Sequence, residues 1–195
     1  MNEDIFHSTP WEQMTGGGLY NASDKALLDE LIRVRQKCFL LNSTSPLEEE
    51  KRRELLREII PSQGEGLTVV SPFFCDYGTN IEIGDHTFFN MGCVILDEGK
   101  VRFGSHVFVG PQCGFYTACH PLDAGKRNAL LQYTRPIVVG DNVWIGGGVK
   151  VMPGVSIGSG SVIGGGSVVV SDIPEGVIAC GNPCRVVRKI SPGEI

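Results

Sequence analysis

Residues 139–170 decide the fold and read VGDNVWIGGGVKVMPGVSIGSGSVIGGGSVVV. Every sixth position of this stretch is aliphatic, and these positions are Val139, Ile145, Val151, Ile157, Ile163 and Val169. A six-residue period fits neither the turn of an α-helix, about 3.6 residues, nor the two-residue alternation of a strand. It predicts a parallel β-helix, in which each hexapeptide supplies one short strand and one corner, and three hexapeptides close a triangular coil.

The same period continues toward the amino end. The side chains expected to point inward are Ile83, Phe89 and Ile95 in one coil and Phe103, Val109 and Phe115 in the next. These two coils are offset by 20 residues rather than 18, which predicts two extra residues near Glu98-Gly99. A step of 24 residues separates Phe115 from Val139, so at least six residues form an inserted loop within residues 120–136. Long loops inside a compact repeat are usually functional.

Two helices are expected before the repeat. The first covers residues 24–41, whose apolar positions at helical spacing are Leu27, Leu28, Leu31, Val34, Cys38 and Leu41. The second begins at Ser45-Pro46-Leu47-Glu48, which offers a capping hydroxyl, a proline at the first helical position and a glutamate three residues after the cap. Its expected buried side is formed by Leu47, Leu55, Leu56, Ile59 and Ile60, and it ends before Pro61.

This pattern divides the chain into two parts. We expect a helical extension over residues 1–62 and a β-helix domain over residues 63–195, which carries the inserted loop at about 120–136 and a carboxyl-terminal tail.

Composition narrows the class of partner. The chain has 195 residues and a formal charge of −5, which argues against nucleic acid as the main partner because phosphate binding needs clustered Lys and Arg. The amino end, Met1-Asn2-Glu3-Asp4, lacks the basic start and apolar run of a secretory signal, and no apolar stretch is long enough to span a bilayer. We therefore expect a cytoplasmic protein without a membrane partner. The seven cysteines form no C-x-x-C pair, so reduced and mostly buried thiols are expected.

Several further stretches complete the pattern. They are CDYGTNI (75–81), NMGCVILD (90–97), YTACHP (116–121), NVWIG (142–146) and GNPCRVV (181–187), with Leu19-Tyr20 ahead of the helices. With them the chain resembles the hexapeptide-repeat acyltransferases, and specifically the galactoside and maltose O-acetyltransferases. The resemblance implies a left-handed β-helix, a homotrimer with sites between neighbouring coils, and transfer of acetyl from acetyl-CoA to a sugar hydroxyl.

The resemblance also assigns the chemistry. Acetyl transfer to an alcohol needs a base for the hydroxyl proton and donors for the tetrahedral oxyanion. His120, where the chain enters the loop, matches the family's catalytic histidine and would be the general base. Asn90 would hold the acceptor hydroxyl or the developing charge, because a carboxamide donates without adding negative charge. Without the resemblance, His120 fits a solvated turn residue and Asn90 a corner residue that tolerates a left-handed φ.

Three carboxylates are candidates for acceptor binding. By the resemblance Asp76 and Glu98 align with acceptor-contacting positions, and Asp24 would serve from the helical extension. Carboxylates accept hydrogen bonds from sugar hydroxyls and so orient them. Glu98 stands where galactoside relatives have Asp, so the identity of the sugar stays open, and all three also fit ordinary surface charges.

Cofactor binding is expected along the coil edges and at the carboxyl end. The residues that the resemblance implies for the pantetheine are Gly147, Gly165, Val170 and Ser171, with the Gly147 N–H near the thioester carbonyl. Arg185, Arg188 and Lys189 form a basic cluster for the phosphates of coenzyme A. Trp144 would flank the cleft. The alternatives are corner glycines, a solvated charged tail and an aromatic on the outer face of the coil.

A metal site is not expected. His86 and His106 lie 20 residues apart, which is one coil, so they should stack on the same corner. A zinc hydratase of this fold uses three convergent histidines, which this pattern does not provide. Two alternatives stay open: an acetyltransferase for another hydroxyl, such as that of serine or a xenobiotic, and a noncatalytic or carbonic anhydrase-like β-helix trimer.

Overall fold

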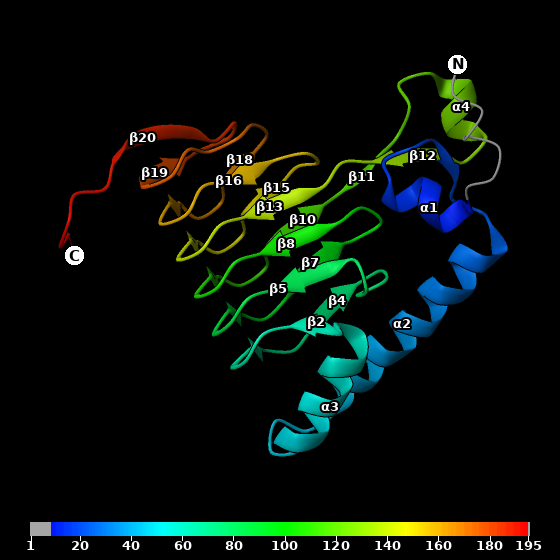
Figure 1. The fold of residues 1–195 in the computed structure, drawn as a ribbon, viewed down its shortest axis with the longest axis horizontal. Helices are drawn as coiled ribbons and strands as arrows, with labels where there is room; N and C mark the ends of the chain where they lie inside the picture. The colour runs from blue at the N-terminus through cyan, green and yellow to red at the C-terminus, as the bar shows by residue number, and fades with distance from the viewer. Residues whose placement is uncertain (1–8, 195) are drawn as a thin grey trace.

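The computed structural model describes residues 9–194, and most of them form a parallel β-helix with helices at one end (Figure 1). The residues Met1-Asn2-Glu3-Asp4, on which the expectation of no secretory signal rested, lie outside this range. The short strands stack into three sheets whose neighbours come from successive coils. This is the architecture that the six-residue period predicts.

Each coil contributes one strand to each sheet. The first sheet contains β2 (Ser62–Gln63), β5 (Ile81–Ile83), β8 (Val101–Phe103), β13 (Ile137–Val139) and β16 (Ser156–Ile157). The second contains β3 (Thr68–Val69), β6 (Phe88–Phe89), β9 (Phe108–Val109), β14 (Trp144–Ile145), β17 (Val162–Ile163), β19 (Val177–Cys180) and β20 (Arg185–Lys189). The third contains β4 (Phe73–Cys75), β7 (Cys93–Leu96), β10 (Gly114–Tyr116), β15 (Lys150–Val151) and β18 (Val168–Val169). Within these three sheets, all described pairs are parallel except β19 with β20.

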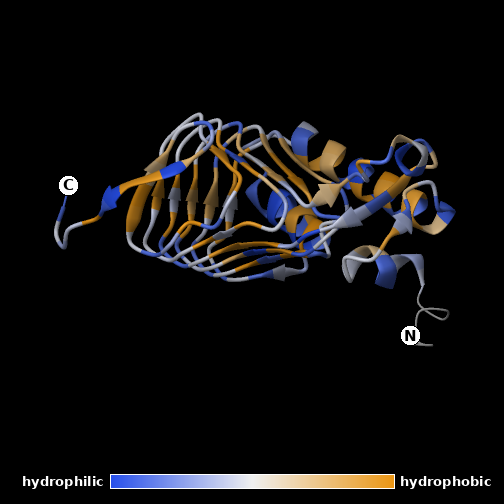
Figure 2. Cartoon of the chain, turned by 90° about the horizontal axis from the view of Figure 1, so that it is seen from above, coloured by the Kyte–Doolittle hydropathy of each residue, from blue (hydrophilic) through white to orange (hydrophobic). Residues whose placement is uncertain are grey.

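The core of the coil is the predicted inward column of apolar side chains. All six aliphatic positions of residues 139–170 are buried, and so are the six inward positions predicted for the earlier coils. Phe103 meets both Phe89 and Phe115 edge to face, with ring centroids 4.9 Å apart in each pair. Stacked rows of hydrophobic strands run along the axis (Figure 2). The β-helix is therefore a continuous core rather than a hollow tube.

The strand register shows where residues are added to the coil. Ile83 pairs with Phe103, 20 residues further on, and the two extra residues lie after β7, as predicted. Phe103 then pairs with Val139, 36 residues further on, whereas Val139 pairs with Ile157 after 18. The insertion is thus a whole coil's length, well above the minimum of six residues. The step of 24 residues from Phe115 to Val139 suggested a shorter insertion because it was compared with a full coil. These two residues lie in neighbouring sheets, so without an insertion they would be one hexapeptide apart.

The inserted segment has its own secondary structure. It contains β11 (Ala118–Cys119), α4 (Ala124–Asn128) and β12 (Leu131–Thr134). The chain leaves the coil directly after β10, somewhat before the predicted start at residue 120, because β11 pairs antiparallel with β12. β12 also pairs with β1 (Tyr20–Asn21), so the amino-terminal segment and the insertion form a small sheet beside the coil (Figure 1).

The amino-terminal helices are α1 (Pro10–Thr15), α2 (Lys25–Ser43) and α3 (Glu49–Ile59). α1 was not predicted, although Thr9 and Glu12 form a capping box at its start. The buried residues of the other two are Leu27, Val34, Cys38, Leu41, Leu56 and Ile59. Most of these residues share one apolar cluster with the interior of the coil, so α2 and α3 close its open end.

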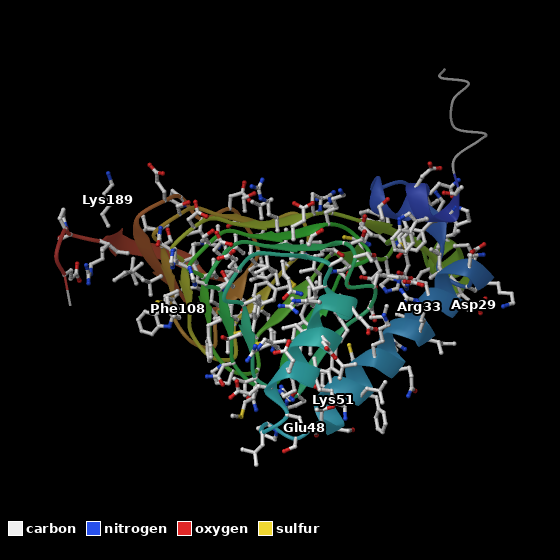
Figure 3. All side chains as sticks on the ribbon, turned by 60° about the horizontal axis from the view of Figure 1, so that its bottom comes forward. Asp29, Arg33, Glu48, Lys51, Phe108 and Lys189 are labelled. Carbon is white, nitrogen blue, oxygen red and sulfur yellow. The ribbon has the colours of Figure 1, made fainter. Side chains whose placement is uncertain are left out.

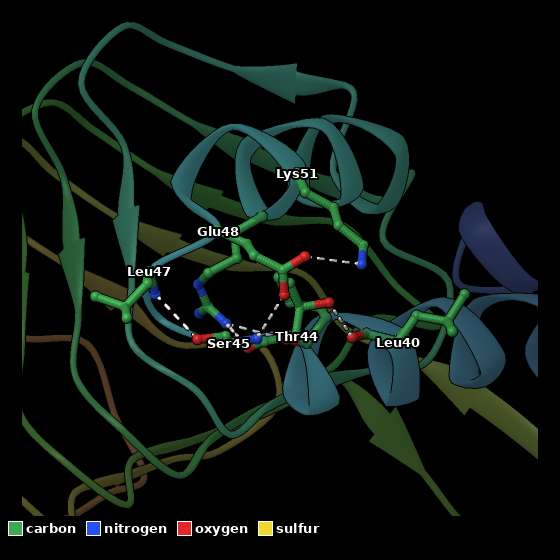
Figure 4. Close-up of polar contacts among 8 residues, drawn as sticks. Leu40, Thr44, Ser45, Leu47, Glu48 and Lys51 are labelled. Atoms are coloured by element: carbon green, nitrogen blue, oxygen red, sulfur yellow. Dashed lines mark hydrogen bonds and ion pairs between the residues drawn. The ribbon is translucent and has the colours of Figure 1, made fainter.

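Two details of the predicted helices are wrong. α3 begins at Glu49 rather than at Pro46, because residues 45–48 form a separate turn in which the Glu48 N–H donates to the Ser45 carbonyl over 3.0 Å. The Ser45 hydroxyl accepts from the Leu47 N–H at 3.3 Å and so caps that turn (Figure 4). Leu47, expected on the buried side, is consequently 93% exposed, and Leu28 also lies at the surface.

Within residues 9–194, no helix has the length and apolar character needed to cross a membrane.

Candidate active site

Three acidic residues meet where the third sheet ends. Asp76 follows β4, and Asp97 and Glu98 follow β7 at the same edge of that sheet. Asp97 is fully buried, and its Oδ1 accepts from the backbone N–H groups of Asp76 at 3.0 Å and Tyr77 at 2.9 Å. The extra residues in these two corners give the chain room to turn the carboxylates toward one another. We call Asp76, Asp97 and Glu98 the acidic corner.

Two oxygens of the acidic corner are buried without a hydrogen-bond partner in the described chain. They are Oδ2 of Asp97 and Oε2 of Glu98. Burial raises the pKa of Asp97 to about 6. Burial and the neighbouring Asp76 charge raise the pKa of Glu98 to about 8. Glu98 therefore holds a proton near neutral pH and can donate as well as accept.

Asp76 has a basic partner on the helical extension. The Arg35 Nη2 atom of α2 lies 3.1 Å from Asp76 Oδ1, and the Asp76 side chain is almost fully buried. Because the Arg35 side chain is largely exposed, this ion pair stands at the boundary between the acidic corner and solvent. It ties the helical extension to the same corner of the coil.

Aromatic residues that no sequence pattern had marked as functional lie around the acidic corner. The Tyr20 hydroxyl donates to Gln132 Oε1 over 2.8 Å. The pKa of Tyr20 is raised, first by burial and then by Glu98, Tyr77, Asp76 and Cys119. Tyr20 thus lies near both the acidic corner and the residue before His120.

Trp11 meets Tyr77 edge to face at 5.2 Å on the same side of the chain. Tyr20 and Tyr77 stand in two sequence stretches that carry the family resemblance, Leu19-Tyr20 and CDYGTNI (75–81).

His120 is exposed at the start of the inserted segment, directly after β11. The carboxyl edge of the third sheet carries both this segment and the acidic corner, since Gly99 N–H donates to Thr117 Oγ1 over 2.8 Å. The structure therefore brings the loop of His120 together with Asp76 and Glu98.

Asn90 lies at the other edge of the third sheet. It follows β6, at the corner where the second sheet turns into the third, and its N–H donates to the Val109 carbonyl over 2.9 Å. Its own Oδ1 accepts from the Met91 N–H at 2.8 Å. Within one chain, the width of the third sheet separates Asn90 from His120. The structure does not bring these two predicted catalytic residues together in a single copy.

The predicted cofactor residues divide between the same two corners. Gly147 and Gly165 stack on the corner of Asn90, where the Gly147 carbonyl accepts from the Gly166 N–H at 2.8 Å. No atom lies within 4 Å of a Cβ built on Gly166, so backbone at this corner is open to a ligand. Val170 and Ser171 follow β18, at the corner between the third and first sheets.

The basic cluster and Trp144 lie on the outside of the coil. All of β20 is exposed, Lys189 projects from it (Figure 3), and Arg188 is held by Glu194 in a two-pronged ion pair with one contact of 2.8 Å. Among residues 9–194, the one hydrogen bond found for the Arg185 guanidinium goes to the neighbouring Cys184 carbonyl, over 2.8 Å. Trp144 is 58% exposed beside Phe108 on the outer face of the second sheet. Arg185 is thus freer than Arg188 to meet an anion.

Asp24 has a structural role at the start of α2. Its Oδ1 accepts from the N–H groups of Ala26 at 2.9 Å and Leu27 at 3.4 Å, which caps the helix. No hydrogen bond or ion pair joins it to the acidic corner in the described part of the chain. Asp97, which sequence reasoning did not select, is the third carboxylate of that corner.

His86 and His106 stack as predicted, with ring centroids 5.2 Å apart on one corner of the coil. Both have positive φ, as does Asn142 on the next coil. Among residues 9–194 there is no group of three or more metal-ligating side chains close enough to hold an ion.

The chain matches two family models and is similar to known proteins over most of its length. Residues 13–64 match the maltose acetyltransferase hexapeptide capping motif, and residues 136–171 match the bacterial transferase hexapeptide family as six repeats. A putative acetyltransferase of Saccharomyces cerevisiae is 48% identical over 181 residues, 92% of each chain. Nodulation protein L of Rhizobium meliloti is 44% identical over 178 residues, 91% of this chain and 97% of that one.

Solved structures agree closely with the fold. A maltose O-acetyltransferase from Clostridium difficile superposes with a TM-score of 0.92 at 44% identity, covering 94% of this chain and 98% of that one. A galactoside acetyltransferase in complex with coenzyme A gives a TM-score of 0.90 at 36% identity, covering 95% and 92%. A hexapeptide-repeat acetyltransferase from Vibrio cholerae, complexed with acetyl-coenzyme A, gives 0.87 at 36% identity, covering 94% and 100%.

Proposed function

Because the chain belongs to the hexapeptide-repeat acetyltransferases of the maltose and galactoside type, we propose that it transfers acetyl from acetyl-CoA to a hydroxyl of a sugar. The observation that carries the sugar assignment is the acidic corner, whose Asp97 Oδ2 and Glu98 Oε2 are buried without partners. Buried polar atoms are normally satisfied, so these oxygens favour a ligand that brings hydroxyl groups.

The protonation of the acidic corner suits a sugar. Adjacent sugar hydroxyls each donate and accept, and a neutral Glu98 offers a donor beside the acceptor oxygens of Asp76 and Asp97. Tyr20 and Tyr77 are buried beside the same corner and form part of its apolar wall. We assign Asp76 and Glu98 to acceptor binding, as the sequence predicts, and add Asp97 as the residue that holds the Asp76 turn in place.

For the donor, the support comes from the open glycine corner and from relatives. The galactoside and Vibrio enzymes were solved with coenzyme A and acetyl-coenzyme A. In this chain Gly147 and Gly165 would bond the pantetheine amides, Val170 and Ser171 would line its path, and Arg185 and Arg188 would meet the phosphates. Arg188 must first exchange Glu194 for phosphate. Trp144 would flank this path on the outer face.

The proposed reaction is a direct transfer. The neutral imidazole of His120 takes the proton of the acceptor hydroxyl while that oxygen attacks the thioester carbon. The Gly147 N–H and the Asn90 carboxamide hold the tetrahedral oxyanion. The carbon–sulfur bond then breaks, the carbonyl reforms as the acetyl ester, and the departing thiolate receives the proton from His120.

This chemistry requires more than one copy of the chain. Asn90 and His120 lie at opposite edges of the third sheet, so a site containing both must join the corners of two neighbouring chains. Large apolar side chains on the outer faces of the second and third sheets favour such contacts, and Phe74, Phe108 and Trp144 are each about half exposed there. We propose a homotrimer. At each of its three equivalent interfaces, the Asn90 corner of one chain would meet the His120 corner of its neighbour.

The experiment that tests the function is a thiol-release assay with acetyl-CoA and a panel of maltose, glucose, galactosides and serine. At least one sugar should release thiol well above the rate of hydrolysis. His120→Ala should remove most of that turnover, about 100-fold or more, while coenzyme A binding stays nearly unchanged. Release with serine alone would replace the sugar by another hydroxyl acceptor. If none of the acceptors releases thiol above the rate of hydrolysis, the proposal is wrong.

A further inference from the structure

Two buried cysteines meet where the helical extension joins the coil. Cys38 on α2 and Cys75 at the end of β4 are 2% and 3% exposed, and their sulfur atoms are 3.9 Å apart. These residues are 37 positions apart in the sequence. A disulfide bond requires about 2.05 Å between sulfurs. The two sulfur atoms must therefore move closer together before they can bond.

Both thiols line a groove that opens to the surface. It lies between α2 and the outer face of the third sheet and has a volume of about 560 Å³. Its walls are mainly apolar, and Phe39 and Phe74 on its rim are exposed. A small uncharged molecule that enters the groove therefore meets Cys38 and Cys75 in its wall.

The two thiols differ in reactivity. The hydrogen bond from Cys75 lowers the pKa of Cys38, because it stabilises the Cys38 thiolate. The same hydrogen bond and burial raise the pKa of Cys75. The thiolate is the nucleophile in thiol oxidation, so the direction of these pKa shifts favours Cys38 as the attacking residue and Cys75 as the resolving one.

We propose that Cys38 and Cys75 form an oxidation site, at which a hydroperoxide converts the two thiols into a disulfide. The Cys38 thiolate attacks one peroxide oxygen, the O–O bond breaks, and hydroxide leaves from a Cys38 sulfenic acid. The Cys75 sulfur then attacks the Cys38 sulfur, the S–O bond breaks, and the proton of Cys75 leaves with the hydroxyl group as water. With hydrogen peroxide, the net reaction turns two thiols and one oxidant into one disulfide and two waters.

The other thiols of the chain lack this combination. Cys93 and Cys113 also shift each other's pKa through a hydrogen bond, but both are fully buried inside the coil and neither lines the groove of Cys38 and Cys75. Cys180 is exposed, and its sulfur forms no contact of this kind with another thiol in the described chain. Selective oxidation of the Cys38–Cys75 pair follows from the groove and the short sulfur contact together.

A disulfide here would act on the acidic corner. Arg35 lies one helical turn before Cys38, and its partner Asp76 directly follows Cys75. Drawing the two sulfurs together moves both ends of the Arg35–Asp76 ion pair. The oxidised protein should therefore bind an acceptor differently, with the acceptor KM changed several-fold and the acetyl-CoA KM nearly constant. The oxidation itself does not depend on the proposed function.

The test is limited oxidation of the full chain by hydrogen peroxide, followed by alkylation, mass spectrometry and peptide mapping. The expected product has lost two alkylatable thiols and about 2 Da, contains a Cys38–Cys75 cross-linked peptide and reverts with dithiothreitol. In Cys75→Ser, dimedone should trap a sulfenic acid at Cys38. Cys180→Ser, which removes the exposed thiol, should form the cross-link at the wild-type rate.

Two results would overturn the proposal. One is preferential oxidation of Cys180 or Cys184 while Cys38 and Cys75 remain alkylatable. The other is the absence of dimedone labelling at Cys38 in a folded Cys75→Ser variant. Because these readouts use mass and labelling alone, they remain decisive even if the reduced enzyme acetylates no sugar.

Discussion

Asp97 shows at the residue scale how structure and chemistry meet in one side chain. One of its oxygens fixes the backbone of Asp76 and Tyr77, and the other is buried without a partner. The first oxygen explains how Asp76 is held, and the second is one of the buried acceptors on which the proposed sugar assignment rests. A buried carboxylate with this arrangement is tolerated because two backbone donors compensate part of its desolvation.

Replacing Asp97 tests its structural role. Asp97→Ala leaves the N–H groups of Asp76 and Tyr77 buried without an acceptor, which should destabilise the fold by about 1–3 kcal/mol. Asp97→Asn keeps an oxygen acceptor and should recover most of that loss. Thermal melting at one protein concentration measures both. Equal melting temperatures for wild type and Asp97→Ala would show that these hydrogen bonds do not stabilise the corner.

Glu98 should make stability depend on pH. Its pKa in the folded chain is raised to about 8 from an ordinary 4.5. The favourable contribution of the protonated carboxyl is therefore complete below pH 4.5 and is lost as pH rises through about 8.

Glu98→Gln isolates this effect, because the amide stays neutral at every pH. The melting temperature of wild type relative to Glu98→Gln should fall between pH 5 and pH 9, values chosen to bracket the pKa of about 8. A difference that stays constant over this range would mean that Glu98 is ionised throughout.

At the scale of single elements, the inward column carries the stability of a coil. Phe103 on β8 is buried against Phe89 and Phe115, whereas Arg102 on the same strand points to solvent. Phe103→Ala should cost about 3–5 kcal/mol of unfolding free energy, because it removes apolar contact and leaves a cavity. Arg102→Ala is the matched control and should change little. Denaturant unfolding measures the free energy of unfolding of both variants. Equal losses in the two variants would contradict the prediction.

The strands were predictable because a fixed period repeats the same information in every coil. Val139, Ile145 and Val151 lie inward as their spacing requires. The start of α3 was mispredicted because Ser45 and Glu48 carry the signals of a helix cap and here form a separate turn. The secondary structure of the insertion had no period to show it, since β11, β12 and β1 are stabilised by pairing between distant segments.

The candidate site was predictable only in part, because the sequence does not show which carboxylates are buried or already hydrogen-bonded. Motifs indicated Asp76 and Glu98, and the corners that carry them do converge. Asp97 was passed over because nothing in a sequence shows that its carboxylate is buried and half satisfied. Asp24 looked equally acidic, but its oxygen is used to cap α2. Which carboxylates are available to a ligand depends on hydrogen bonds that only the fold defines.

At the scale of the whole molecule, the separation of Asn90 and His120 is the most consequential feature. The corner of Asn90, Gly147 and Gly165 and the corner of His120 and Glu98 stand at opposite edges of one sheet. A single chain therefore carries the proposed oxyanion donors at one edge and the proposed base at the other. Assembly is required for the proposed catalysis, and the exposed apolar outer faces supply surfaces for it.

Mixed assemblies of two inactive variants test this account most directly. His120→Ala and Asn90→Ala should each be nearly inactive in acetyl transfer to a sugar. When the two are co-expressed, each mixed trimer contains an interface with an intact His120 from one chain and an intact Asn90 from its neighbour. One of the three sites in each mixed trimer should then recover activity. Mixed trimers that stay as inactive as the single variants would contradict a site shared between chains.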